Sequence, residues 1–160
     1  MKTTAGEVMD TQYDTLKPDL PLSEAVRAFR QASTKGRKIF GMMVTDDTGQ
    51  LIGMLSMYDI LLYMRPKHIH IWGDMDDIDV KGIIDMACEK AKSVRIGDIM
   101  TTEVVTVSPN THVLRVMDLM IKKHIRRLPV LEDGQIRGII YISDLFYDLL
   151  ERLSEEGTAQ

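Results

Sequence analysis

Two aspartates, Asp59 and Asp144, each follow a short apolar run and fall in what the sequence predicts to be the opening turn of a helix. A carboxylate is favourable near the positive end of a helix, and it can accept hydrogen bonds from two adjacent hydroxyls, as in a ribose. Ser56 stands between strand and helix, where its hydroxyl can meet a ribose or a phosphate, and the free N–H groups of the helix start can receive phosphate oxygens. The alternative is that Ser56 and Asp59 only cap the helix. The second copy of the pattern favours a binding role.

The elements that position these residues occur twice in the chain. Residues 6–10 (GEVMD) return as residues 97–101 (GDIMT), a shift of 91, and residues 53–61 return as residues 138–146, a shift of 85. A period of about ninety residues is too long for a solenoid unit. Two copies therefore predict a duplicated half-domain with pseudo-twofold symmetry, in which each half covers the apolar face of the other.

Each repeat is predicted to run β-α-β-β-α, which gives the fold class α/β (α+β). In the second repeat a strand over residues 104–107 precedes a helix with Asn110 or Thr111 as its N-cap. Two strands then flank a turn at residues 132–134, and Ser143 caps the last helix. The first repeat gives the same order of elements.

The expected organisation is a first repeat, a connecting insert, a second repeat and a frayed tail. Ile83, Ala87 and Ala91 predict a helix within the insert. The expected bounds of the four parts are 1–62, 63–94, 95–153 and 154–160.

These repeats resemble a known family, the CBS (cystathionine beta-synthase) domain pair, also called a Bateman module. The resemblance rests on residues 97–100 (GDIM), 126–130 (RRLPV) and 138–145 (GIIYISDL), and on their order and duplication. It implies a ligand cleft between the two halves for AMP, ADP, ATP or S-adenosylmethionine. The family signature is a glycine, two apolar residues, Ser or Thr, two variable residues and an aspartate.

The resemblance also implies which residues bind the ligand. Repeat 1 satisfies the signature with Gly53, Ser56 and Asp59. Repeat 2 keeps the glycine and the aspartate but has Tyr141 in the Ser/Thr place, where a ring would fill space that a ribose needs. The expected ligand-binding residues are Thr15, Met42, Met43, Ser56 and Asp59 in repeat 1, and Thr106, Arg126, Arg127, Leu128, Pro129, Tyr141 and Asp144 in repeat 2.

Two subsites follow from that set. The residues beside Thr15, Met42 and Met43, and those around Thr106, Leu128 and Pro129, would form a flat apolar slot for adenine. Arg126 and Arg127 belong to a basic cluster that could reach phosphates, and Arg can do so bidentately. A solvated face is the alternative for this cluster. Its other members are Lys122, Lys123 and His124, and its counterpart in repeat 1 is Lys35, Arg37 and Lys38.

Composition and absent motifs narrow the function classes. The net charge of −4 disfavours nucleic acid and anionic membranes as partners. The sequence contains no phosphate-binding loop, no dinucleotide-binding fingerprint and no nucleophile elbow, so no catalytic residue is expected and the chain is not expected to be an enzyme. The single Cys88, with no signal peptide and no transmembrane run, points to a reducing compartment and a cytoplasmic location.

The expected function is a regulatory module that binds an adenosine ligand, needs no cofactor, and signals to a protein partner by changing conformation. A homodimer is expected, since the family commonly forms flat twofold dimers. One alternative is a ligand-free structural dimerisation module. Another is a metal-binding protein that uses His68 and His70 of the insert, although that spacing is weak evidence and no metal ligand is assigned. Trp72 beside them is expected to pack the insert or contact a dimer partner.

Overall fold

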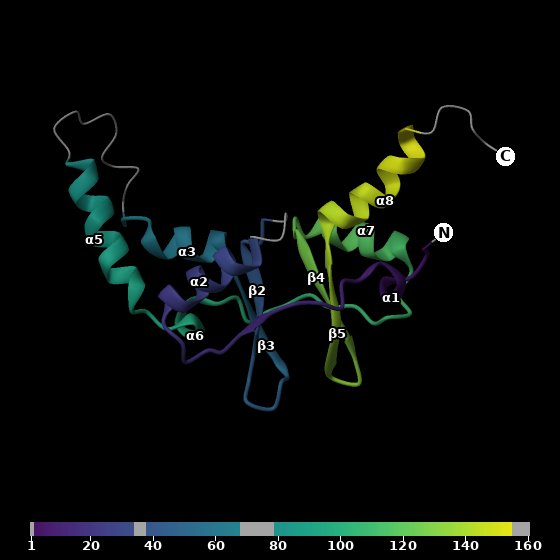
Figure 1. Cartoon of the computed structure of the whole chain (residues 1–160), viewed down its shortest axis with the longest axis horizontal. Helices are drawn as coiled ribbons and strands as arrows, with labels where there is room; N and C mark the ends of the chain where they lie inside the picture. The colour runs from purple at the N-terminus through teal and green to yellow at the C-terminus, as the bar shows by residue number, and fades with distance from the viewer. Residues whose placement is uncertain (1, 34–37, 68–78, 155–160) are drawn as a thin grey trace. The chain divides into compact units, whose positions relative to one another are not determined.

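The computed structural model describes residues 2–33, 38–67 and 79–154 (Figure 1). Contacts divide the chain into two compact units. Unit 1 comprises Met1–Tyr13 and Val105–Gln160, and unit 2 comprises Asp14–Val104. Each unit packs a small sheet against helices, so the predicted mixed α and β class is confirmed. The units do not coincide with the sequence repeats, because the opening segment of each repeat belongs to the unit that is built from the other repeat.

In the described part of unit 2, a three-stranded sheet is accompanied by four helices. The strands are β1 (Thr15–Leu16), β2 (Gly41–Thr45) and β3 (Leu51–Ser56), in the order β1-β2-β3, with β1 parallel and β3 antiparallel to β2. The helices are α2 (Leu22–Ser33), α3 (Met57–Met64), α5 (Val80–Lys92) and α6 (Ile96–Ile99). The helix predicted in the insert is therefore present as α5, which begins where the Asp79 side chain accepts a hydrogen bond from the Gly82 N–H at 3.0 Å.

The core of unit 2 follows from apolar spacing. Leu22, Ala25 and Phe29 recur at the helical period and are the buried residues of α2. All five residues of β2 are buried, as expected for a central strand that is paired on both sides.

Unit 1 is built in the same way on a two-stranded antiparallel sheet. Its strands are β4 (Arg127–Glu132) and β5 (Gln135–Tyr141), and its helices are α1 (Ala5–Val8), α7 (Val113–Lys122) and α8 (Ile142–Ser154). The buried cluster joins Ala5 of α1 to the apolar faces of α7 and α8 and to both strands. Its members are Ala5, Val107, Val116, Met120, Leu128, Val130, Ile140 and Leu145.

The strand predicted over residues 104–107 is wrong. Only Val107 pairs with the sheet, in an isolated parallel bridge to Val130. In unit 2 the matching segment is β1, where Thr15 pairs with Met43. The equivalent pairing of Thr106 with Pro129 would need a backbone N–H at Pro129, and proline has none. The ladder therefore stops after one bridge.

Two predicted helix starts are also wrong. The N-cap of α7 is His112, whose Nδ1 accepts a hydrogen bond from the Arg115 N–H at 3.1 Å, and not Asn110 or Thr111. The hydroxyl of Thr111 accepts instead from the Ser108 N–H, inside the preceding turn. Helix α8 begins at Ile142, directly after β5, so Ser143 lies within the helix and does not precede it.

The opening segments of the two repeats make the same backbone contacts, each in the other repeat's unit. In unit 1 the Asp10 N–H donates to the Ile139 carbonyl at 2.8 Å, and the Ile139 N–H donates back to Asp10 at 3.0 Å. In unit 2 Thr101 and Met54 exchange the same pair of bonds at 2.8 and 2.9 Å. These residues are related by the shifts of 91 and 85 seen in the sequence, so the repeat extends to individual hydrogen bonds.

Glycine is required where these segments cross the strands. A Cβ on Gly138 would lie 2.8 Å from the Asp10 carbonyl oxygen and 2.8 Å from Met9 Cγ. A Cβ on Gly53 would lie 2.9 Å from the Thr101 carbonyl oxygen. Both distances are shorter than van der Waals contact, and the obstacle includes backbone, which cannot rotate away as a side chain can.

We predict that Gly138→Ala lowers the free energy of unfolding by about 1–3 kcal/mol, because the new methyl group pushes the segment at Asp10 off β5. Urea denaturation measures the change. Gln135→Ala, at the exposed start of β5, is the control, with an expected change within about 0.5 kcal/mol. Equal stability of Gly138→Ala and the unmodified chain would contradict the close approach.

Candidate functional site

Ser56 and Asp59 form a reciprocal cap at the start of α3. The Asp59 N–H donates to Ser56 Oγ at 3.4 Å, and the Ser56 N–H donates to Asp59 Oδ2 at 2.9 Å. The Ser56 hydroxyl also donates to Asp59 Oδ2 at 3.2 Å. The capping role that the sequence left open is therefore present. It fixes the carboxylate at the end of the helix where the free N–H groups lie.

Thr101 is a further hydrogen-bond donor to this carboxylate. Its hydroxyl donates to Asp59 Oδ1 at 3.0 Å, across 42 residues of sequence. Sequence reasoning missed Thr101, because nothing local in the GDIMT segment shows that it crosses β3. The only available signal was its alignment with Asp10 in the repeat. Asp59 thus holds the start of α3 with one oxygen and the chain after α6 with the other.

The register of the sheet separates the two methionines that were predicted together. Thr15 pairs with Met43 and Met43 with Met54, while Gly41 pairs with Ser56. Since side chains alternate along a strand, Thr15, Met43 and Ser56 share one face of the sheet, and Met42 projects from the other. Met42 and Met43 are both buried, whereas Thr15 is exposed. The side chains of Met42 and Met43 therefore cannot line the same slot.

The corresponding face in unit 1 carries larger side chains. Arg127 pairs with Tyr141, and Pro129 pairs with Ile139, so these four share a face, while Leu128 projects from the opposite one. Arg127 and Tyr141 are half-buried, and Leu128 and Pro129 are buried.

The remaining predicted residues of unit 1 lie near the ends of these elements. Asp144 is half-buried in the first turn of α8, where Asp59 lies in α3. Thr106 and Arg126 are exposed. Backbone pairing brings Arg127 and Tyr141 together, whereas Thr106 lies outside any strand.

The two units therefore differ in the size of the side chains at one pair of matching strand positions. The small residues Gly41 and Ser56 stand opposite each other in unit 2, and the large residues Arg127 and Tyr141 stand at the matching positions in unit 1. The same backbone positions thus carry small side chains in unit 2 and large ones in unit 1. The expectation that Tyr141 occupies a ligand's place stays a prediction.

The basic cluster is spread over the end of α7 and the turn that follows. Lys122 pairs with Asp118 at 3.3 Å on the same helix, and His124 adopts a left-handed conformation with φ of 52°. Lys38 is exposed, whereas Lys35 and Arg37 lie outside the described residues.

The predicted alternative of a metal site falls on residues that the structure does not describe, since His68, His70 and Trp72 lie between positions 67 and 79. Among the described residues, no group of three or more His, Cys, Asp or Glu side chains is arranged to hold a metal ion. Cys88 is half-buried within α5.

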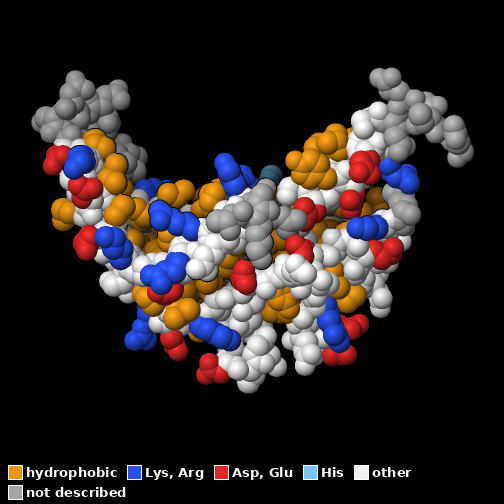
Figure 2. Space-filling model, viewed as in Figure 1, with side chains coloured by type: hydrophobic (Ala, Val, Ile, Leu, Met, Phe, Trp, Pro, Cys, Tyr) orange, Lys and Arg blue, Asp and Glu red, His pale blue; other side chains and the backbone are white. Residues whose placement is uncertain are grey.

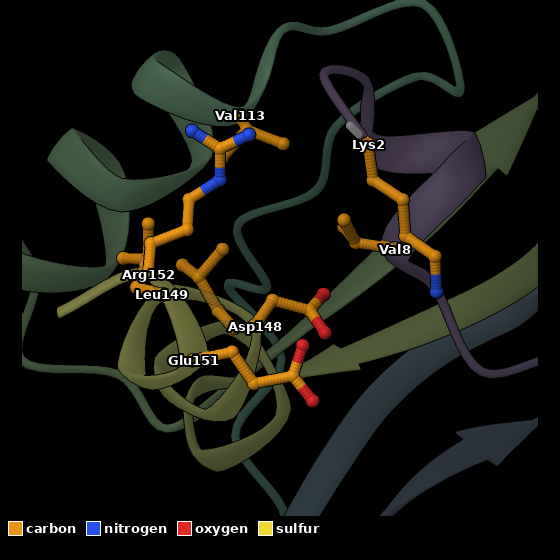
Figure 3. Close-up of a pocket in the computed structure, with 8 residues that line it drawn as sticks. Lys2, Val8, Val113, Asp148, Leu149, Glu151 and Arg152 are labelled. Carbon is orange, nitrogen blue, oxygen red and sulfur yellow. The ribbon is translucent and has the colours of Figure 1, made fainter. Parts of the chain in front are cut away.

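A separate pocket of about 350 Å³ lies in unit 1 between the N-terminal segment, α7 and α8 (Figure 3). None of the twelve predicted ligand-binding residues lines it. The residues that do are Lys2, Val8, Val113, Leu145, Asp148, Leu149, Glu151 and Arg152.

Comparison with known proteins establishes the family. The model of the CBS domain matches residues 5–66 and again residues 96–151, more than half of the chain, and the chain belongs to this family. The resemblance stated from the sequence is therefore confirmed, including its two copies.

Two curated relatives show the range of similarity. The mitochondrial CBS domain-containing protein CBSX3 of Arabidopsis thaliana is 41% identical over 132 residues, and the match covers 77% of this chain and 64% of that protein. The chain thus spans less than two thirds of this relative's length. An uncharacterised protein of Methanocaldococcus jannaschii is 27% identical over 162 residues, which cover 91% of this chain and 94% of the relative.

Solved structures share the fold at low identity. The crystal structure of CBSX2 in complex with AMP has a TM-score of 0.68 at 22% identity, covering 94% of this chain and 98% of the other. The cytosolic domain of the Mg²⁺ channel MgtE in complex with ATP has a TM-score of 0.67 at 23% identity, covering 92% of this chain and 49% of the other. Across the described part of the chain, no helix has the length and apolarity needed to cross a bilayer.

We predict that Ser56→Ala lowers the free energy of unfolding by about 1 kcal/mol, because it removes the side-chain half of the cap on α3. Thermal or urea denaturation measures the loss. Ser143→Ala is the matched control: Ser143 lies inside α8, and the change should stay within about 0.5 kcal/mol. The cap is refuted if the two variants are equally stable.

Proposed function

We propose that the chain is a regulatory module that binds an adenosine nucleotide beside Ser56 and Asp59 and catalyses no reaction. The observation that carries the proposal is the carboxylate of Asp59, fixed at the start of α3 by hydrogen bonds from Ser56, whose partner in the sheet is the small residue Gly41. Membership of the CBS-domain family supports it, as do the AMP complex of CBSX2 and the ATP complex of the MgtE cytosolic domain. AMP, ADP, ATP and S-adenosylmethionine are the candidate ligands.

In this proposal each part of a nucleotide meets one chemical group. The ribose hydroxyls donate to Asp59, where the negative charge strengthens both hydrogen bonds. A phosphate accepts from Ser56 Oγ and from the N–H groups that begin α3. The adenine lies along the sheet face that carries Thr15 and Met43.

Thr101 links ligand binding at Asp59 to a change in the conformation of the chain. A ribose hydroxyl that takes Asp59 Oδ1 displaces the Thr101 hydroxyl, which holds that oxygen at 3.0 Å in this structure. Thr101 follows α6, and α6 follows α5, so the loss of this bond loosens the attachment of both helices to β3 and α3. A ligand can shift conformation only through such a difference in contacts between two states.

The second site is proposed to be weak or empty, since Arg127 and Tyr141 fill the matching position of unit 1. If it is occupied, Arg126 and Arg127 are the residues that reach phosphate, and Thr106, Leu128, Pro129 and Asp144 line the rest.

A homodimer is part of the proposal. Large apolar side chains are exposed on α3 and α8, among them Tyr58, Leu61, Phe146 and Tyr147. Figure 2 shows hydrophobic side chains gathered over α8 and along α5. The cytoplasmic location stays a prediction, since the relatives CBSX3 and CBSX1 are named mitochondrial and chloroplastic.

The test is calorimetric titration of the purified chain with AMP, ADP, ATP, GTP and S-adenosylmethionine. We expect saturable binding of an adenosine ligand, and we expect Asp59→Asn to weaken it about 10- to 100-fold through the loss of charge-assisted hydrogen bonds. Asp144→Asn is the matched control in the other unit and should leave this site unchanged.

A negative result would favour the second candidate, a structural dimerisation module without a ligand. That reading is supported by the engagement of both Asp59 oxygens within the protein and by the large pair in unit 1. If none of the five ligands binds to folded protein that carries no co-purified nucleotide, the structural dimerisation module is established over the nucleotide sensor.

We predict that Thr101→Val raises the affinity for the adenosine ligand about 2- to 10-fold. Valine has no hydroxyl to donate to Asp59 Oδ1, so that oxygen can accept a hydrogen bond from the ribose without first losing another. The same titration measures this change. Thr102→Val, one residue further along the chain and also exposed, serves as the control. Weaker binding by Thr101→Val would show that Thr101 supports the bound state and does not compete with it.

A further inference from the structure

The side chain of Met100 lies against Gly53, within β3. A Cβ built on Gly53 would stand 2.7 Å from Met100 Sδ and 3.1 Å from Met100 Cγ, so the thioether fills the space that a side chain at position 53 would take. Gly53 is buried, whereas Met100 is half-buried and keeps some contact with solvent. The sulfur is thus a packing atom of unit 2 in a residue that solvent still reaches.

The residue after Met100 contacts the candidate site. Thr101 exchanges backbone hydrogen bonds with Met54 at 2.8 and 2.9 Å, and its hydroxyl donates to Asp59 at 3.0 Å. Helix α6, which ends immediately before Met100, contacts both β3 and α3. The packing of the Met100 thioether on Gly53 therefore belongs to the attachment that holds Thr101 beside Asp59.

A thioether is a group that a peroxide can modify. The sulfur forms a bond to one oxygen of hydrogen peroxide and the O–O bond breaks. The hydrogen of the transferred oxygen passes to the departing hydroxide, which leaves as water. The sulfur is oxidised by two electrons and the peroxide is reduced by two. The product, methionine sulfoxide, is polar where the thioether was apolar.

An oxygen on the sulfur of Met100 would be poorly accommodated against Gly53. The backbone N–H groups of this contact are already used, since the Met100 N–H donates to the Ile96 carbonyl at 2.9 Å, and those of Thr101 and Met54 donate to each other's carbonyl. A polar oxygen that is buried without a donor is unfavourable, and so is added volume against a strand. Movement of Met100 off Gly53 would let the oxygen reach water, and it would carry the next residue away from β3.

The repeat supplies an internal comparison. Met9 occupies the equivalent position in unit 1, where its Cγ and Sδ each lie 2.8 Å from a Cβ built on Gly138. Oxidation of Met9 would act on the hydrogen bonds between Asp10 and Ile139. It would leave the contact of Met100 in unit 2 as it is.

We propose that Met100 is an oxidation site, and that its conversion to the sulfoxide by hydrogen peroxide releases the segment at Thr101 from β3 and from Asp59. Oxidation of this sulfur acts on the candidate site without changing Ser56 or Asp59. The readouts are the chemical state of Met100 and the local opening of unit 2, so the oxidation site can be tested whether or not a nucleotide binds.

The test treats the purified full chain with hydrogen peroxide, locates added oxygen by peptide mass spectrometry and measures amide hydrogen exchange. We expect Met100 to gain one oxygen, and we expect the amides of Thr101 and Met54 to exchange about tenfold faster. Met100→Leu keeps the volume but has no oxidisable sulfur, and it should show no such acceleration after the same treatment. Met9→Leu is the matched control and should respond at Thr101 as the unmodified chain does.

A second variant imitates the modification without peroxide. Met100→Gln places a polar side chain against Gly53, and we expect faster exchange at Thr101. Met9→Gln should instead speed exchange at Asp10 in unit 1. This pair separates the effect of Met100 from oxidation elsewhere in the chain. Unchanged exchange in Met100→Gln would show that a polar group can remain at Gly53, contrary to the proposal.

Three results of the peroxide treatment would overturn the proposal. In the first, Met100 stays unoxidised while Met57 and Met86, which are 37% and 75% exposed, are converted. In the second, Met100 is oxidised but exchange at Thr101 does not change. In the third, treated Met100→Leu exchanges as fast as the treated unmodified chain, so that the opening is caused by another residue.

Discussion

The fold depends on the pairing of a few backbone groups at Asp10 and Thr101 with the outer edges of β5 and β3. Each pair of bonds satisfies polar groups at a strand edge that would otherwise lie open, and each brings a short helix, α1 or α6, against the strand. The glycines at positions 53 and 138 make this possible, because no side chain fits between the strand and the crossing segment. As a result neither sequence repeat is a complete structural unit by itself.

This exchange also assembles the candidate site. Asp59 and Thr101 are distant in sequence, yet they are hydrogen-bonded because the segment after α6 crosses β3 just before α3 begins. The carboxylate serves the cap of α3 and the anchor of that segment at once. In the proposed function, a ligand that competes for one of these bonds acts on the attachment of the segment.

Duplication has kept the backbone and varied the side chains. Gly41 and Ser56 in unit 2 correspond to Arg127 and Tyr141 in unit 1, so the same face carries small side chains in one unit and large ones in the other. Tyr63 lies beneath α5, whereas its counterpart Asp148 lines a pocket. Pro129 in place of Met43 removes one donor and reduces a strand to a single bridge.

The sequence by itself determined the family, the duplication, the mixed α and β class and the positions of most helices and strands. These depend on local periodicity, turn residues and recurring motifs, which are properties of short segments, and they placed Ser56 and Asp59 at the start of α3. The tertiary structure decided which segments pair across the repeats, that Met42 and Met43 face opposite ways, and that Thr101 meets Asp59. These features depend on strand register and on contacts between residues far apart in the chain. Because the two repeats offer nearly identical partners for an opening segment, local sequence cannot distinguish pairing within a repeat from pairing across them.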